Sequence, residues 1–159
     1  MALSEAVTVQ VHGLAELEKA LMQLPEAVAG KALNGAIAAG MGSIRKEATA
    51  LIPVGSRAHY LGSKAKGRLV QPGHLSKQLR TRRVRSDKFS CLYALTFSKP
   101  GFYGMFHEFG TSKMAANPIL RPAFDNRKDR ALELIKERLA ANIERQRKKL
   151  YLENLRAGR

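Results

Sequence analysis

The sequence is poor in cysteine, in acidic residues and in long apolar runs. Cys91 is the only cysteine, so no disulfide can form within the chain and a cysteine-based zinc site is not expected. No apolar run approaches the roughly 20 residues that span a bilayer. Residues 1–10 lack the basic start and apolar core of a signal peptide. We therefore expect a protein made in a reducing cytosol, with no membrane segment.

The net charge of +15 is unevenly distributed. Acidic residues number 13 against 28 lysines and arginines. Residues 57–88 carry +9 and residues 127–159 carry +6, so the rest of the chain is nearly neutral. Such basic blocks attract DNA, RNA, an anionic membrane or an acidic protein surface. The length of 159 residues fits one domain, which we place at residues 1–145, followed by a basic extension at 146–159.

The first third of the chain predicts a strand and two helices. Valines alternate with polar residues over residues 7–12, which is typical of a strand. Leucines then recur at helical spacing over residues 14–24, and Pro25 interrupts this helix and starts another. The residues expected on the buried side of the second helix are Val28, Ala32, Ile37, Ile44, Ala48 and Leu51.

Four glycines within this second helix have two interpretations. Each of Gly30, Gly35, Gly40 and Gly42 costs about 1 kcal/mol relative to alanine in a helix. They indicate either a weak or kinked helix or a close approach to a neighbouring element. Both interpretations remain open from the sequence.

The rest of the chain predicts a basic loop, a small antiparallel sheet and a last helix. Pro53 ends the second helix, and residues 54–78 have no sustained period, which favours a long loop. Residues 79–85 and 91–97 are expected to pair as strands across a turn at 86–88, and residues 99–101 form another turn. Residues 102–109 suit either a third strand or a short helical turn. Pro118 and Pro122 predict an extended stretch before a helix that carries Leu132 and ends in a frayed segment, residues 151–159. The fold class is therefore α+β.

The motifs of common enzymes are absent or incomplete. His107-Glu108 resembles the start of a zinc-protease HExxH motif, but Thr111 stands where the second histidine is required. The four histidines have no metal-ligand spacing, and no Gly-x-Ser-x-Gly elbow or phosphate-binding glycine loop is present. Glu108 and Asp125 are the only carboxylates of residues 89–126, and Cys91 lies in a strand, where a core role is commoner than a nucleophilic one. We expect no enzyme activity, no metal and no cofactor.

The basic residues of the central region form a candidate phosphate-binding set. They are Arg57, Lys64, Lys66, Arg68, Lys77, Arg80, Arg82, Arg83 and Arg85. No zinc-finger spacing, RNP-like aromatic pair or convincing helix-turn-helix accompanies them, although recognised nucleic-acid modules show more than charge. A basic nucleic-acid-binding accessory protein and a solvated loop that orders against neighbours are the alternatives.

One stretch resembles a phage protein family. Residues 103–114 read YGMFHEFGTSKM, and residues 115–124 read AANPILRPAF. The chain here resembles the tail-component or tail-completion proteins of lambda-like long-tailed phages, also called neck or head–tail connector proteins. That family shows a Tyr-Ala strand, a Glu-Phe-Gly-Thr turn and a Pro-Phe-Leu-Arg-Pro-Ala step into the last helix. Gly104 and Ile119 replace the usual alanine and phenylalanine, and about twenty residues from Val54 to Gln71 are inserted.

The resemblance implies a structural subunit of the virion. It implies a homo-oligomeric ring, hexameric or dodecameric, at the junction of head and tail, contacting the connector or stopper and the tail terminator or tail tube. Passing contact with phage DNA is also expected. The motif residues that the resemblance marks as interface candidates are Tyr103, Glu108, Phe109, Gly110, Thr111, Pro118, Leu120, Arg121, Pro122 and Ala123. Turn chemistry alone also explains them: Gly110 permits a tight turn, the prolines fix the path, and Glu108 could accept hydrogen bonds from the backbone or Thr111, or pair with Arg121.

Overall fold

The computed structural model describes residues 15–61, 67–87 and 90–157, and within them the fold is α+β, as the sequence predicts. The strand expected at residues 7–12 lies outside the described residues. The elements in chain order are α1 (Ala15–Met22), α2 (Glu26–Leu51), β1 (His59–Leu61), β2 (Arg68–Val70), α3 (His74–Gln78), β3 (Leu79–Ser86), β4 (Cys91–Phe97), the 3-10 turn η1 (Lys99–Gly101), α4 (Gly104–Phe109) and α5 (Leu120–Arg156).

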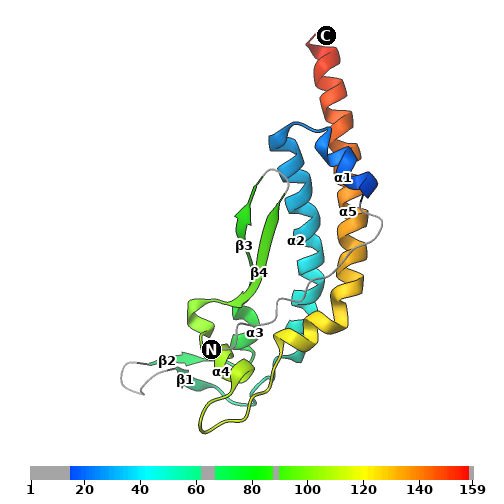
Figure 1. Cartoon of the computed structure of the whole chain (residues 1–159). Coiled ribbons are helices and arrows are strands. Elements are labelled where there is room, and N and C mark those ends of the chain that lie inside the picture. Colours follow the sequence, from blue (N-terminus) through cyan, green and yellow to red (C-terminus); the bar gives the residue numbers. More distant parts are fainter. Residues whose placement is uncertain (1–14, 62–66, 88–89, 158–159) are drawn as a thin grey trace.

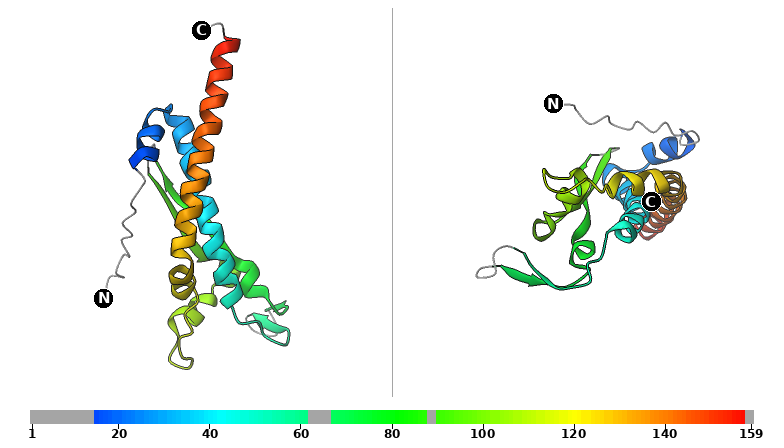
Figure 2. Two further views of the ribbon diagram at one scale, coloured as in Figure 1. Left: turned by 90° about the vertical axis from the view of Figure 1, so that its right-hand side faces the viewer. Right: turned by 90° about the horizontal axis from the view of Figure 1, so that it is seen from below.

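The molecule is long and built around two antiparallel helices. Helices α2 and α5 pack along each other, and the β3–β4 hairpin lies along another side of α2 (Figure 1). The β1–β2 hairpin, α3 and α4 gather at the end where α5 begins. At the opposite end α1 packs on α5, and the last turns of α5 project beyond the other elements (Figure 2). Helix α5 therefore begins near one end of the molecule and ends at the opposite extreme (Figure 2).

Small side chains let α2 and α5 approach closely. The buried residues of α2 are Ala29, Ala32, Ala36, Gly40, Ile44 and Ala48. Their spacing of three and four makes one stripe of the helix. On the facing side α5 buries Ala131, Leu139 and Ile143. The sequence placed Ala32, Ile44 and Ala48 correctly, whereas Val28 and Ile37 are only partly buried and Leu51 is 40% exposed.

The two interpretations of the glycines are resolved position by position. Helix α2 runs unbroken from Glu26 to Leu51. A Cβ atom at Gly40 would lie 2.6 Å from Ile135 Cγ1 of α5 and 2.9 Å from the Ala131 carbonyl oxygen. A Cβ at Gly35 would lie 3.0 Å from Asn142, whereas Gly30 and Gly42 have nothing within 4 Å. Close approach therefore explains Gly40 and, less strictly, Gly35.

The long loop predicted at residues 54–78 is wrong in part. It contains the β1–β2 hairpin, paired from His59↔Val70 to Leu61↔Arg68, and the short helix α3. Val70 and Leu75 from this segment are buried, and Leu75 joins a second core cluster with Ala48, Ile52, Leu79, Ile119 and Ala123. The apolar residues of this segment are too few to show a helical or strand period in the sequence. Packing against other elements therefore decides its local structure.

The predicted pairing of residues 79–85 with 91–97 is confirmed. The register runs from Leu79↔Phe97 to Ser86↔Cys91, with an irregularity between Arg83 and Arg85. The polar end of the hairpin is fastened to α2 by Asn34. The Asn34 amide donates to Ser86 Oγ at 2.9 Å, and the Cys91 thiol donates to Asn34 Oδ1 at 2.7 Å. One face of the hairpin is thereby held against α2.

The last helix begins earlier and ends later than predicted. Pro122 is the third residue of α5, where no intrahelical N–H bond is required, so the extended stretch stops before Leu120. Residues 151–156, expected to be frayed, continue α5 without a break. The helical alternative for residues 102–109 is the observed one, because α4 spans Gly104–Phe109.

Candidate functional site

The family-like motif folds into a helical module whose Glu108 caps α5. Glu108 Oε2 accepts a hydrogen bond from the backbone N–H of Ile119 at 2.7 Å and from that of Leu120 at 3.0 Å. These N–H groups belong to the start of α5 and have no carbonyl partner within the helix. Of the roles predicted for Glu108, backbone acceptance is the observed one, and neither Thr111 nor Arg121 hydrogen-bonds to it within the described chain.

Gly110 turns the chain between α4 and α5. Its φ of 72° lies in the region that side chains rarely adopt, and a Cβ atom there would lie 2.8 Å from the Ala116 nitrogen. Thr111 and Met114 exchange backbone hydrogen bonds of 2.8 and 3.2 Å, and the Asn117 N–H donates to the His107 carbonyl at 2.7 Å. The turn is thus closed by its own backbone.

The remaining motif residues divide between core and surface. Ala123 is buried in the second core cluster, and Leu120 packs against it. Pro118 and Arg121 are exposed, and Pro122 is partly buried. Ala123 therefore has a packing role, whereas Arg121 is free to meet another molecule.

Tyr103 links the module to α3. Its hydroxyl lies 2.8 Å from His74 Nδ1, and the two rings stack with centroids 6.0 Å apart. Burial raises the pKa of the Tyr103 phenol, which keeps it protonated and unsuited to act as a base near neutral pH.

The module leaves a continuous apolar face uncovered. Phe102, Met105, Phe106 and Phe109 are 50, 56, 45 and 75% exposed. Their spacing of i, i+3, i+4 and i+7 places them on one side of a helical turn. Phe102 and Phe106 meet edge to face with centroids 5.8 Å apart. We call these four side chains the apolar face.

The exposed area of the apolar face is larger than that of a single apolar residue on the surface. Aromatic side chains each offer roughly 150–250 Å², so these fractions leave on the order of 400 Å² of apolar surface exposed. The largest apolar patch of an ordinary monomer is about 300–600 Å² and is often functional. Sequence reasoning marked only Phe109 of this set, although the helical spacing of all four was present in the sequence.

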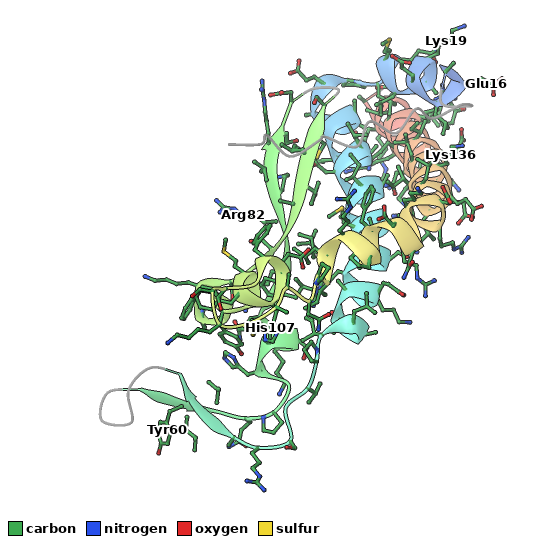
Figure 3. The ribbon with its side chains drawn as sticks, turned by 60° about the horizontal axis from the view of Figure 1, so that its bottom comes forward. Glu16, Lys19, Tyr60, Arg82, His107 and Lys136 are labelled. Atoms are coloured by element: carbon green, nitrogen blue, oxygen red, sulfur yellow. The ribbon has the colours of Figure 1, made fainter. Side chains whose placement is uncertain are left out.

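An open cavity of about 320 Å³ lies beside the module. Its lining includes Arg57, His74, Tyr103 and His107, and no carboxylate from the described residues. His107 is labelled in Figure 3, near the junction of α4 with the rest of the molecule. The described lining of the cavity therefore carries basic and aromatic groups.

The other residues tested for chemistry have structural partners. The carboxylate of Glu108 is engaged in capping α5. Burial raises the pKa of the Cys91 thiol, which opposes thiolate formation. Among residues 15–61, 67–87 and 90–157, no three His, Cys, Asp or Glu side chains form a group able to hold a metal ion.

The basic residues expected in one loop lie in separate places. Arg57 lines the cavity, Lys77 is exposed on α3, and Lys64 and Lys66 lie outside the described residues. Arg68 is on β2. The last four belong to one strand, β3: Arg80, Arg82, Arg83 and Arg85. The structure therefore concentrates the charge on the β3–β4 hairpin.

The far end of α5 also exposes apolar side chains. Tyr151, Leu152 and Leu155 are 64, 45 and 56% exposed on the part that projects beyond α1 (Figure 2). In the described part of the chain no helix is long and apolar enough to cross a membrane. The molecule thus has apolar surface at both extremes.

Comparisons of the chain with protein-family models, curated proteins and solved structures found no match.

Proposed function

We propose that the chain is a structural, non-enzymatic subunit at the head–tail junction of a tailed phage, where it forms a ring with copies of itself and joins the tail to the capsid connector. The observation that carries the proposal is the apolar face. In the family-like module the Glu108 carboxylate and the backbone of the Gly110 turn are used internally, whereas the four side chains of the apolar face are exposed.

The shape of the molecule supports assembly. The apolar face and the exposed apolar end of α5 lie at opposite extremes, so one copy can offer different surfaces to two neighbours. Contacts between different surfaces generate a ring when the rotation closes. The apolar face of about 400 Å² supplies roughly half of the 800 Å² per partner found in a stable interface, so further contacts are expected from other elements.

Solution mass tests assembly. We expect light scattering of the purified protein, without DNA, to give a closed ring, hexameric or dodecameric, with the same mass at low and high salt. Phe106→Ser with Phe109→Ser should yield monomers that remain folded by circular dichroism. A matched control, Met22→Ser with Val54→Ser, removes equally exposed apolar groups elsewhere and should keep the ring. A wild-type monomer, or equal effects of both variants, contradicts ring formation through this face.

Phage genetics tests the location. Deleting the gene from a phage that encodes the chain should leave DNA-filled heads and separate tails in electron micrographs, with infectivity restored by the wild-type gene. Intact, infectious virions from the deletion phage would overturn the proposal. Nearby genes for portal, major capsid and tail-tube proteins are also expected.

A further inference from the structure

The hairpin β3–β4 has one face held by α2 and one face that is free. Cys91 and Tyr93 reach Asn34 of α2 through hydrogen bonds of 2.7 and 3.4 Å. Because successive side chains in a strand point to opposite faces, Leu92, Ala94 and Thr96 lie on the other face. That outer face is turned away from α2, as the labelled Arg82 shows in Figure 3.

Arginines occupy the β3 side of this outer face. The register pairs Arg80 with Thr96, Arg82 with Ala94 and Arg85 with Leu92. By strict alternation Arg85 would lie on the opposite face from Arg80 and Arg82. The register shift between Arg83 and Arg85 brings it onto the same face. Arg83 is on the other side, near Cys91, where burial raises the pKa of the thiol and the Arg83 charge offsets only part of that rise. We call Arg80, Arg82 and Arg85 with their cross-strand neighbours the arginine face.

The arginines of this face are exposed and largely unneutralised. Arg80 and Arg82 make no hydrogen bond or ion pair with the described residues, and both are exposed. Arg85 pairs with Asp87 at 2.8 Å, but the two side chains are 73 and 48% exposed. Exposed ion pairs contribute little stability, so this one is easily exchanged for another anion.

We propose that the arginine face binds the phosphate backbone of duplex DNA, a function that goes beyond assembly of the ring. A two-stranded antiparallel ribbon fits the major groove, which is about 12 Å wide. Arg80 to Arg85 span roughly 15 Å at about 3.3 Å per residue, and a row of cations along one strand suits the row of charges along a DNA strand. Ala94 and Thr96, the cross-strand neighbours of Arg82 and Arg80, have shorter side chains than arginine.

A simpler role for these charges is protection of a free strand edge against aggregation. Protection of the edge requires charged side chains but no bound phosphate, so it predicts that these arginines contribute nothing to DNA binding. Lysine retains the charge and most phosphate attraction, whereas glutamate retains protection of the edge and repels DNA. Charge reversal therefore distinguishes the two roles: DNA binding predicts a loss of DNA affinity, whereas edge protection alone predicts none.

The test measures the salt dependence of DNA binding by the full chain. Fluorescence anisotropy of a labelled duplex of about 24 base pairs, long enough to cover the footprint of one groove-binding ribbon, gives the affinity at several salt concentrations. Each phosphate that the protein no longer neutralises should reduce the slope of log affinity against log salt by about 0.9. We expect Arg80→Gln, Arg82→Gln and Arg85→Gln together to reduce it by between about 2 and 3, and the three lysine replacements to preserve it.

A matched control removes the same charge elsewhere. Arg138→Gln, Arg145→Gln and Lys148→Gln neutralise three exposed positions of α5 and should leave the slope nearly unchanged. Equal reductions in the two glutamine triples would overturn the proposal, because binding would then follow net charge alone. It is also overturned if the wild-type protein ignores DNA, or if polyglutamate of equal charge displaces DNA as well as unlabelled duplex does.

Charge reversal separates DNA binding from edge protection. The triple glutamate variant, checked for folding by circular dichroism, should stay as free of aggregation as the wild type while its affinity for DNA falls at least tenfold. A glutamate variant that binds DNA like the wild type contradicts the proposal. Ring formation is read separately by light scattering, so failure of either proposal leaves the other to be judged by its own result.

Discussion

Removal of the Glu108 carboxylate tests the structural basis of the helical module. Its Oε2 accepts N–H bonds from Ile119 and Leu120 at 2.7 and 3.0 Å, and the side chain is partly buried. Loss of a capping side chain costs about 0.5–2 kcal/mol, and hydrogen bonds to a charged group contribute about 1.5–3 kcal/mol. Because water reaches this site, we take about 2 kcal/mol for Glu108→Ala.

The expected result is a clear loss of stability with an unchanged denaturant slope. A loss of about 2 kcal/mol corresponds to a fall of about 4–8 °C in Tm for a chain of this size. Urea unfolding followed by circular dichroism measures it, and an unchanged m-value shows that the unfolded state is unaffected. Glu108→Gln keeps a carbonyl acceptor and loses only the charge, so its loss should stay below about 1 kcal/mol.

Asp125→Ala is the matched control for charge near the same helix end. Asp125 lies in the second turn of α5 and makes no hydrogen bond or ion pair with the described part of the chain. Its removal should change stability by less than about 0.5 kcal/mol. The capping argument is refuted if Glu108→Ala costs no more than Asp125→Ala, or if the glutamine and alanine variants lose equally.

Three further predictions concern other parts of the fold. Gly40→Ala should destabilise by about 1–3 kcal/mol because its methyl group meets α5, whereas Gly42→Ala should stabilise by about 0.5–1 kcal/mol; similar urea midpoints for the two would contradict the close approach. A side-chain hydrogen bond from Arg127 lowers the pKa of Glu47, so the pair stabilises at neutral pH and this contribution disappears as pH falls through the lowered pKa. Arg127→Met should therefore melt below the wild type at neutral pH and match it at about pH 2, and a constant difference across pH would count against the pair. Because burial raises the pKa of Cys91, iodoacetamide should modify it more slowly in the folded than in the urea-unfolded protein, as mass spectrometry can follow.

Long periodic segments were predictable because their signal is local. The leucines before Pro25 mark α1, Pro25 marks the start of α2, and alternating residues from Cys91 to Phe97 mark β4. In each case the pattern repeats over enough residues to outweigh single exceptions. The turn at Gly110 was also predictable, because a tight turn with positive φ suits glycine.

The segment from Val54 to Gln78 was not predictable in this way. Its hairpin and the helix α3 are short, and their fixed points are Val70, which is buried, and Leu75, which joins a core cluster formed by distant parts of the chain. Likewise, the period of residues 102–109 allowed a strand or a helix until Gly104 packed against Phe97, where a Cβ would lie 2.7 Å from the ring. Tertiary packing selects between such alternatives.

The sequence by itself determined the α+β class, the order of the main elements, the turn at Gly110 and the surplus of positive charge. Only the tertiary structure decided that Glu108 caps α5, that four arginines share one strand with three on its free face, and that the aromatic side chains of the module point outward. The physical reason is the distance along the chain over which each feature is determined. Helical and strand periods, turns and charge are properties of neighbouring residues, whereas a cap, a face and an exposed surface depend on which distant elements cover the rest.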